Sequence, residues 1–488
     1  MNSGFKSRCV PNYRLLTEEQ VQELHRATLE ILETIGVRVA HPEAVEMLRA
    51  AGCRIKPDNI VLMPNWLVEE SIRSAPSRIT LYNRKGKEAM RLEGRNVYFG
   101  LGTDLIDTYD LKTGELRPSV LQDVVNATVV TDYCREIDFL ASFALPHDVP
   151  TNTMYIECVR AMMFNSIKPI FTTAAGAEDL AHIIEMGEMV AGGREQLREK
   201  PFLIHYSEPT PPLFHSYGAV QKLFLCADRG VPITYVPGAM LGGSAPVTIA
   251  GGVAQANAEA LSGIVLHQLR AKGAPIISGW AVVTMDMLDS TFSYGAPESR
   301  LTNSVFADLY HYYEIPTWSI VGTDAHAFDQ QASMETAVAI LMAALDGANL
   351  VHDIGYMGQG RIGHPAMLVM SNEIISYVKR IMRWFGLTRE ELALDVIRQV
   401  GPGGNYLAEE HTLKNFRQHL WKPHFMNRTD PEGWKVKGGK TYGDVVVQKT
   451  LDILKTHRPE PLEAEVQEKI NEIVRKAEKE LKGKHFKA

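Results

Sequence analysis

The sequence predicts an α/β protein built on a (β/α)8 TIM barrel, with an N-terminal helical and strand extension and C-terminal helices. Three observations support this prediction. Eight short apolar runs recur along the middle of the chain, their starts are spaced 30–43 residues apart, and nearly every run ends in polar and glycine residues. Each interval can hold one helix with its turns, and eight strands alternating with eight helices is the pattern of this barrel.

The eight apolar runs are the predicted strands, and they place the barrel core at residues 96–371. They are, in chain order, Asn96–Asp104, Asp138–Pro146, Lys168–Ala174, Pro201–Pro209, Val231–Ala239, Ala274–Ala281, Ile315–Ala325 and Asn349–Met357. Parallel strands of such a barrel end on one face, and the loops of that face form the active site. The residues at the ends of the runs are therefore the candidates for chemistry.

The residues before the barrel, 1–95, are expected to form the extension of helices and strands. Thr17 begins a capping-box pattern, and apolar residues follow it at helical spacing. A turn signal lies at residues 83–86 between two apolar stretches. The expected elements are helices at Thr17–Ile35, Pro42–Ala51 and Trp66–Ala75, and short strands within Ile79–Arg91.

The barrel helices are clearest after the third, fifth and seventh predicted strands, at Ala177–Val190, Thr248–Lys272 and Met334–Gly347. The residues after the barrel, 372–488, are expected to form a helical region and tail. Its elements are helices at Asn372–Phe385 and Thr388–Gln399, an insertion-like stretch at Tyr406–Asp430 and a charged helix at Glu463–Lys482. An apolar stripe on the last helix predicts a packing or homo-oligomer contact.

Composition limits the classes of function. An apolar fraction of 45% is ordinary for a soluble globular protein, and a net charge of −7 argues against a general nucleic-acid-binding surface. No stretch reaches the roughly 18 uninterrupted apolar residues of a membrane span, and the first residues show no apolar core of a secretory signal. We therefore expect a cytoplasmic protein with neither nucleic acid nor membrane among its partners.

The residue pattern does not predict a catalytic metal in this chain. A metal-dependent barrel hydrolase would carry His-x-His on an early strand, but the first strand ends Gly-Leu-Gly-Thr-Asp. The rim histidines are single, and the scattered cysteines give no zinc framework and are expected to be structural or inert. There is also no Gly-x-Ser-x-Gly elbow and no rim lysine placed for a Schiff base. The rim histidines are His205, His326 and His352, and the cysteines are Cys9, Cys53, Cys134, Cys158 and Cys226.

Aromatic and acidic residues occur together at the predicted strand ends. Aromatic ring faces with nearby carboxylates attract organic cations, by about 0.5–2 kcal/mol for each cation–π contact. We therefore expect a polar-lined cavity there, although the aromatics could instead fill barrel layers while the acids cap helices. The expected cavity residues are Phe143, Tyr206, Trp280 and Tyr356 together with Asp104, Glu208 and Asp324.

A glycine-rich loop, Gly238–Ser244, follows the fifth predicted strand. Such a loop can cradle phosphate, but no Gly-Lys-Ser/Thr follows, so it is not a Walker A motif. The methionine and leucine inside the loop favour a surface for docking a partner or approaching a cofactor. We expect Gly242 and Gly243 to face that partner.

Several longer motifs resemble a known family. GGSAPVTIAGGVAQANAEALSGIVLHQL, GAPIISGW, YGAPESRL, GTDAHAFDQQASMETA and ALDGANLVHDIGYMGQG follow one another between residues 242 and 360. In this order they resemble the trimethylamine:corrinoid methyltransferase superfamily, and the similarity reaches back to LTEEQVQELHRATLEILETIGVRV at residues 16–39.

The resemblance implies an eight-stranded barrel and methyl transfer from a methylated amine to the cobalt(I) of a corrinoid. That cobalamin cofactor is carried by a separate cognate corrinoid protein, which Gly242 and Gly243 would face, and this chain would bind no cofactor tightly. Founding members use pyrrolysine, for which we expect the corresponding place near Thr323–Phe328, but this chain has ordinary residues throughout. It is thus similar to the non-pyrrolysine branch, which demethylates quaternary amines such as glycine betaine.

This reaction does not require acid–base catalysis by the protein. A quaternary ammonium leaves as a neutral tertiary amine, so neither a general acid nor a covalent protein nucleophile is obligatory, and we assign no catalytic residue. The protein must position the N–CH3 bond and stabilise charge. The aromatic and acidic residues would hold the cation, and His352, His326 or Arg361 would meet a substrate carboxylate.

Two other functions stay open at this point. The chain could be another barrel enzyme, such as a metal-dependent lyase or hydrolase, which metal analysis would distinguish. It could also be a non-catalytic paralogue that binds an amine or a corrinoid protein as a sensor. Within the methyltransferase hypothesis, glycine betaine, proline betaine, carnitine and γ-butyrobetaine share a cationic head and differ only in the tail.

Overall fold

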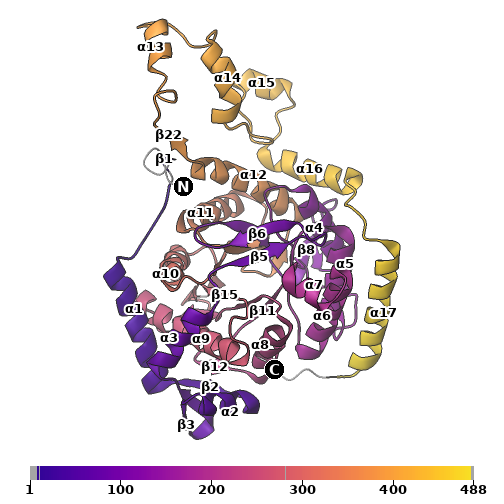
Figure 1. Ribbon diagram of the computed structural model, residues 1–488. Coiled ribbons are helices and arrows are strands. Elements are labelled where there is room, and N and C mark those ends of the chain that lie inside the picture. Colours follow the sequence, from indigo (N-terminus) through magenta and orange to yellow (C-terminus); the bar gives the residue numbers. More distant parts are fainter. Residues whose placement is uncertain (1–7, 10, 281, 485–488) are drawn as a thin grey trace.

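The computed structural model describes residues 8, 9, 11–280 and 282–484, and it confirms the predicted barrel (Figure 1). Seven parallel strands form one sheet, each inside one of the predicted runs. Ala281, the last residue of the sixth run, lies outside the described residues. In spatial order the strands are β10 (Ile170–Thr172), β11 (Leu203–Ser207), β13 (Ile233–Tyr235), β15 (Ile276–Gly279), β18 (Thr317–Ile320), β19 (Leu350–Ile354) and β7 (Tyr98–Leu101).

The second predicted run, Asp138–Pro146, closes the barrel without forming a regular strand. Isolated parallel bridges join Phe139 to Gly100 of β7 and Leu140 to Ile170 of β10. A Cβ atom on Gly100 would lie 2.2 Å from the Phe139 ring, so only glycine lets that ring approach β7. We call residues 138–144 the closing segment; it occupies the eighth wall position with fewer backbone hydrogen bonds than a strand.

Eight helices follow the eight wall segments and surround the sheet. They are α4 (Leu121–Tyr133), α5 (Met154–Asn165), α6 (Ala177–Ala191), α8 (Tyr217–Arg229), α9 (Ile249–Arg270), α10 (Pro297–Tyr313), α11 (Gln330–Asp346) and α12 (Pro365–Met382), and a short α7 (Arg194–Glu199) follows α6.

Two of these helices begin earlier than predicted. Helix α11 begins before Met334 because the Asp329 side chain accepts hydrogen bonds from the first free amides of the helix. Helix α12 begins seven residues before Asn372, since Pro365 fits the first turn and the His364 ring accepts from a first-turn amide. Helix α12 therefore crosses residue 371, the predicted end of the barrel core.

The N-terminal extension contains the predicted elements. Its helices are α1 (Glu18–Glu30, continued by a π-helical turn, Ile31–Ile35), α2 (Pro42–Ala50) and α3 (Asn65–Ser74); its strands are β2 (Val37–Val39), β3 (Arg54–Lys56), β4 (Ile60–Leu62), β5 (Ile79–Tyr82) and β6 (Glu88–Leu92). A 3-10 turn, Pro57–Asn59, joins β3 to β4, and β2 pairs with β12 (Phe214–His215). The Tyr82 amide donates to the Pro201 carbonyl at 2.8 Å, so the β5–β6 hairpin lies at the N-terminal ends of the barrel strands, where Figure 1 shows it.

Two small sheets at the opposite end of the barrel were not predicted. One contains β20 (Tyr356–Met357), β21 (Ile362–Gly363), β8 (Asp107–Tyr109) and β9 (Leu116–Pro118) in that order; the other contains β14 (Ala239–Leu241), β16 (Val282–Met285) and β17 (Phe292–Ser293). We call them the β8 sheet and the β14 sheet. Their strands directly follow the carboxyl ends of barrel strands, so they frame the face where a barrel enzyme binds its substrate.

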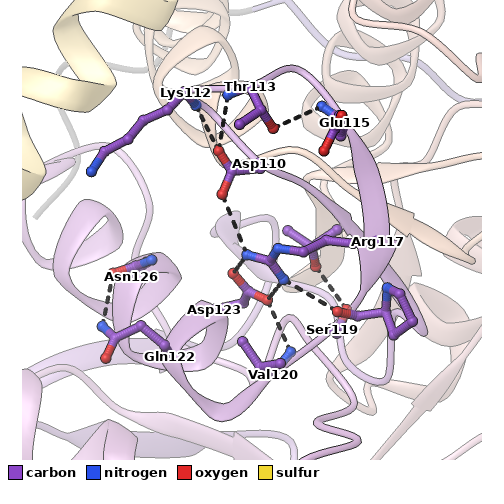
Figure 2. A network of polar contacts seen from close by, with 12 residues as sticks. Asp110, Lys112, Thr113, Glu115, Arg117, Ser119, Val120, Gln122, Asp123 and Asn126 are labelled. Carbon is purple, nitrogen blue, oxygen red and sulfur yellow. Dashed lines mark hydrogen bonds and ion pairs between the residues drawn. The ribbon is translucent and has the colours of Figure 1, made fainter.

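Arg117 fastens the β8 sheet to the start of α4 (Figure 2). Its guanidinium donates to both carboxylate oxygens of Asp123, at 2.7 and 3.0 Å. The same carboxylate accepts from the Val120 amide at 2.9 Å and so caps the helix. Asp110 lies 3.8 Å from the guanidinium and accepts from the Lys112 amide at 2.8 Å, which closes the hairpin turn.

The C-terminal region has two helices on the barrel and one excursion from it. Helix α16 (Tyr442–Thr456) packs on α4 and α12, and α17 (Ala464–Leu481) packs on α5 and α6, as its apolar stripe predicted. Between α12 and α16 come β22 (Phe385–Gly386), which pairs with β1 (Arg8–Cys9), and then α13 (Leu394–Val400), α14 (Glu410–His419) and α15 (Pro431–Val436). We call residues 387–440 the arm; Figure 1 shows it projecting from the side of the barrel.

The structure corrects the predicted helix at Thr388–Gln399, of which only the second half is helical. Helices α15 and α16 were not predicted. Within the described residues, none of the helices combines the length and the hydrophobicity that crossing a bilayer requires.

Candidate functional site

A cavity of about 380 Å³ lies at the carboxyl ends of the barrel strands, where enzymes of this architecture bind substrates. Residues from β11, β18 and β19, from the loops after β7, β13 and β15, and from both small sheets line it. The lining residues are Thr103, Tyr206, Glu208, Gly238, Met240, Trp280, Val283, Phe292, Tyr294, Trp318, Ile320, His352, Asp353 and Tyr356.

Six of the fourteen residues that line the cavity carry aromatic rings of Phe, Tyr or Trp. The Trp318 ring is central, with its centroid 6.1 Å from that of Tyr206 and 6.4 Å from that of Trp280. On another part of the wall, the Tyr294 ring lies 6.1 Å from Tyr356 and 5.3 Å, edge to face, from Phe292. We call these six residues the aromatic box.

Hydrogen bonds and close packing hold the box in place. The Trp280 indole N–H donates to Thr302 Oγ1 of α10 at 2.7 Å. The Tyr356 hydroxyl donates to the Thr103 carbonyl and accepts from the Thr103 amide at 2.9 Å. A Cβ atom on Gly102 would lie 1.8 Å from the Tyr356 ring, so this glycine is needed for the ring position. The box is therefore formed before any ligand arrives.

Two carboxylates complete the lining. Glu208 accepts from the Tyr206 hydroxyl at 2.5 Å. Burial raises the pKa of Glu208, while this hydrogen bond and the nearby Lys222 ammonium lower it. Burial, with the adjacent Glu208 charge, holds the pKa of Tyr206 well above its usual range, so its hydroxyl keeps its proton. Asp353 lies 2.5 Å from His352 Nδ1, and its backbone has a left-handed φ of 73°.

The structure brings five of the eight predicted substrate-binding residues together. Tyr206, Glu208, Trp280, His352 and Tyr356 all line the cavity. They come from β11, β15, β19 and the segments that follow them, so the inspection of strand ends found residues that share one cavity.

Three predicted residues do not line the cavity, and the structure corrects their placement. Phe143 is fully buried in the core, where its ring contacts Gly355 and Gly363. His326 is exposed, and its ring meets the Asp324 carbonyl at 3.1 Å. Asp324 accepts from the Ser293 hydroxyl and from the amides of Tyr294 and Gly295 at 2.8 and 3.0 Å, so it holds the loop that carries Tyr294.

Two further rim candidates also lie elsewhere. Arg361 is exposed. Asp104 lines a neighbouring cavity of about 270 Å³ that also borders Tyr206, Glu208 and Lys222. Burial there raises the pKa of Asp104 to about 6.

Nine lining residues were not among the predicted site residues, and four of these nine are aromatic or charged: Phe292, Tyr294, Trp318 and Asp353. Strand β18 ends at Ile320, five residues before the end of the predicted run, so the sequence directed attention to Asp324 and His326 instead of Trp318. Phe292 and Tyr294 lie in the long connection from β15 to α10. The signal available for them was an aromatic pair in a loop that follows a strand.

Gly242 and Gly243 form the turn after β14. Gly242 has φ 87°, and its amide donates to the Ala245 carbonyl at 3.0 Å. The Met287 sulfur is the atom closest to where a Gly242 Cβ would lie, at 3.0 Å. Exposed Val247, Met287 and Leu288 surround this turn; we call these five residues the β14 tip, an apolar surface beside the cavity.

In the part of the chain that the structure describes, no three His, Cys, Asp or Glu side chains are grouped so that they could hold a metal ion. Cys53, Cys134, Cys158 and Cys226 are buried and form no disulfide. Burial raises the pKa of Cys53 to about 11 and that of Cys134 to about 12, so these thiols are poor nucleophiles at neutral pH.

Comparison with known protein families gives one match along nearly the whole chain. The family model described as trimethylamine methyltransferase (MTTB) matches residues 2–482. Trimethylamine methyltransferase MttB of Desulfitobacterium hafniense strain DCB-2 is 32% identical over 95% of this chain and 94% of its own. The Methanosarcina barkeri strain Fusaro protein of the same name is 31% identical over 99% and 98%.

A relative that is named for another substrate matches this chain over a similar length. Glycine betaine methyltransferase of Desulfitobacterium hafniense strain Y51 is 28% identical over 97% of this chain and 98% of its own. Among solved structures, monomethylamine methyltransferase of Methanosarcina barkeri superposes with a TM-score of 0.53 over 91% of this chain and 88% of that chain, at 11% identity. That likeness shows the same fold.

Proposed function

The chain belongs to the trimethylamine methyltransferase family, and from this we propose that it moves a methyl group from a quaternary amine to the cobalt(I) of a separate corrinoid protein. Methyl transfer follows from the family. The amine is our proposal, because the relatives are named for trimethylamine in some cases and for glycine betaine in another.

The observation that carries this proposal is the aromatic box with its two carboxylates. A quaternary ammonium has no N–H to donate, so a protein holds it through ring faces and opposite charge. Six rings and the carboxylates of Glu208 and Asp353 line one cavity. Its volume of about 380 Å³ suits a small amine that carries a short tail.

The chain's own residues would bind, orient and shield the substrate. Cobalt(I) on the partner supplies the nucleophile, and the ammonium nitrogen keeps the electron pair of the broken N–CH3 bond and leaves as a neutral amine. Trp280 and Trp318, both buried, would fix the ammonium group between ring faces. With the cation fixed, one N–CH3 bond can point out of the barrel, which supplies most of the required orientation.

The proposed substrate is a betaine, with a carboxylate as well as a cationic head. Of the three residues expected to meet that carboxylate, only His352 lines the cavity. Its ring lies 5.8 Å from Trp318 and is buried, so the tail would lie beside the ring that holds the head.

The proposed docking surface for the corrinoid protein is the β14 tip. It adjoins the cavity through Met240 of β14 and Val283 of β16, which line it. Leu288 is 97% exposed at this tip, and exposed apolar clusters of this kind mark protein contacts. The predicted partner-facing residues, Gly242 and Gly243, form its turn.

Methylation of a reduced corrinoid protein, followed by absorbance, tests the function. The substrates are glycine betaine, proline betaine, carnitine, γ-butyrobetaine and trimethylamine. We expect at least one betaine to support methylation and trimethylamine to give none. If no quaternary amine supports it, the proposal fails, and if a betaine binds by calorimetry without turnover, the non-catalytic alternative is correct.

A second candidate function is trimethylamine demethylation, which the names of the relatives at 30–32% identity favour. At neutral pH trimethylamine carries one N–H and needs an acceptor in the cavity. Glu208 and Asp353 are the carboxylates that line the cavity, and Tyr206 occupies only one oxygen of Glu208, so an acceptor is available. Turnover of trimethylamine alone in the panel would establish this candidate over ours.

A further inference from the structure

The arm, all of which the structure describes, has three helices but no buried residue. Leu407, Leu413, Leu420 and Val436 are 89%, 66%, 68% and 87% exposed. Of the 26 exposed large hydrophobic side chains in the described residues, 11 belong to these 54 residues. Short helices are stabilised by burying an apolar stripe, so the arm in a single copy lacks the core that its helices need.

The base of the arm is nevertheless firmly attached to the barrel. The Trp421 indole N–H donates to Ser376 Oγ of α12 at 3.1 Å. Glu373, fully buried on α12, accepts from the amides of His424 and Phe425 at 2.8 and 3.0 Å. The arm is therefore held in one direction, away from its own barrel wall (Figure 1).

A second uncovered apolar face lies on the barrel beside the arm. Met334 and Val338 are exposed one turn apart on α11, and Tyr377 and Ile381 are exposed one turn apart on α12. Helices α11 and α12 pack against each other, so these side chains belong to adjacent helices. Only two of the 17 residues of α11 are charged, Glu335 and Asp346, whereas a barrel helix that faces water carries a polar outer side.

The charges of the arm and the barrel are opposite. Residues 96–382 contain 16 Lys and Arg against 30 Asp and Glu, a net charge of −14, while the arm contains 9 against 7, a net charge of +2. A hollow of about 950 Å³ at the base of the arm is lined by Arg417, Lys422, Arg428, Lys437 and Lys440 and by no Asp or Glu among the described residues. The net charges therefore favour the approach of the arm to another copy, whereas the α11–α12 face itself is apolar, since Asp346 and Glu373 are buried.

We propose that the arm clasps a second copy of this chain, with each arm lying on the α11–α12 face of the other copy. Because the arm begins next to that face, a two-fold axis beside α12 would bring each arm onto the face of the other, as an isologous interface requires. The arm of 54 residues exceeds the 20–30 residues that a partner contributes to a standard interface.

The position of the arm on the barrel favours a second copy of this chain, and not a corrinoid protein, as its partner. A protein that delivers a reactive group to the cavity must approach the carboxyl ends of the strands, whereas the arm leaves from the outer helix α12. The assembly does not depend on the proposed methyl transfer.

Sedimentation equilibrium of the full-length chain tests the proposal. The wild-type mass is expected to be twice 54.4 kDa or a larger even multiple. Leu407→Glu on the arm and Val338→Glu on α11 should each weaken association at least 100-fold, because each places a charge in the interface. Leu288→Glu, at a position even more exposed but on the β14 tip, is the matched control and should associate as the wild type does.

A monomeric wild type, or a Leu407→Glu chain that still associates, would overturn the assembly. Because a charged variant can also fail to fold, a photo-crosslinking amino acid at position 407 gives an independent test. In a mixture of isotope-labelled and unlabelled chains, it should capture peptides from residues 330–346 or 365–382 of the other copy. Capture of peptides from the same chain alone would contradict the proposal.

Discussion

At the residue scale, the cavity depends on side chains that each make a contact outside it. Trp280 reaches Thr302 of α10, and Tyr356 is tied to the backbone of Thr103. A ring held in this way has few rotamers to lose when a cation binds, so more of the cation–π attraction is retained as affinity. Substitutions that remove the indole ring but keep an apolar side chain should therefore report on binding, provided that the variant still folds.

Trp280→Leu should lower kcat/KM for the betaine substrate at least tenfold, because one cation–π contact of about 1–2 kcal/mol is removed. Trp280→Phe keeps a ring face and should lose less. Steady-state methylation of the corrinoid protein measures both, and thermal unfolding checks that each variant folds. Equal kinetics for the Leu variant and the wild type would exclude Trp280 from the site.

Glu259 on α9 predicts a pH dependence of stability. It is fully buried, accepts from the Leu213 amide at 2.9 Å, and burial raises its pKa to about 7. The folded state therefore binds its proton more tightly than the unfolded state, so this stabilisation is present below about pH 4.5 and is lost as pH rises through about 7.

Glu259→Gln removes that titration while keeping an acceptor for the amide. Measured by chemical denaturation, the stability of the variant relative to wild type should increase between pH 5 and pH 8, by up to about 3 kcal/mol. A difference that stays constant with pH would show that the Glu259 carboxyl does not titrate in this range.

The sequence predicted the site residues that directly follow strands, and it missed those that depend on where a strand stops. An apolar run shows that a strand exists but not which of its last residues still pair with neighbours. Trp318 lies inside the seventh run and was not among the candidates at its end, yet β18 is short enough that its ring reaches the cavity. Phe143 shows the reverse error, because its left-handed backbone turns the side chain into the core.

At the element scale, the β8 sheet is too small to be stable alone, and its link to α4 supplies the missing support. Its strands contain only two or three residues each. The buried Asp123 carboxylate, which serves both Arg117 and the first turn of α4, makes the hairpin and the helix depend on each other.

Arg117→Ala should destabilise the protein by about 1–3 kcal/mol, because it leaves the Asp123 carboxylate buried without its cation. Amide hydrogen exchange should rise at Thr108 and Leu116 before it rises in the barrel strands. Arg117→Lys keeps the charge but not the paired hydrogen bonds, so its stability should lie between those of the wild type and Arg117→Ala. Unchanged exchange in β8 and β9 would show that the ion pair is dispensable.

Elements that belong to a longer pattern were predictable, and isolated short ones were not. The barrel strands contain only three to five residues, but each lies in a longer apolar run that recurs along the chain, while α6, α9 and α17 follow from apolar spacing over many residues. The two small sheets have strands of two to four residues, which are too short for any period to emerge. Helix starts were wrongly predicted where a polar side chain directly before the helix caps it, as His364 does for α12.

At the scale of the whole molecule, the fold followed from spacing alone, whereas assembly did not. Eight runs with room for a helix between them define a barrel whatever its chemistry. An exposed apolar residue in a sequence is indistinguishable from a buried one, so the sequence predicted a helix at Thr388–Gln399 and an insertion-like stretch at Tyr406–Asp430 but not their exposure. Only the three-dimensional arrangement shows that no residue of this segment is buried and that Phe425 and Met426, at its base, are among the few that pack against the core.

If the arm joins two copies, thermal stability should depend on protein concentration. Mass action stabilises an associated state as concentration rises, so the Tm of the wild type should increase by a few degrees between about 0.5 and 50 µM. Scanning calorimetry or fluorimetry measures this. Leu407→Glu should show a Tm that does not change with concentration, and a wild-type Tm equally insensitive would contradict association in this range.

The closing segment has a consequence for the kinetics of folding. The seven-stranded sheet can form before the segment joins its two edges, so contacts such as that of Phe139 with Gly100 should be absent from the transition state. Phe139→Leu, if it destabilises by about 1 kcal/mol, should then speed unfolding about fivefold and leave refolding unchanged. Stopped-flow measurements in denaturant give both rates. Slower refolding of Phe139→Leu than of the wild type would mean that the barrel closes before the transition state. On this view the lifetime of the native barrel is set at its least regular wall.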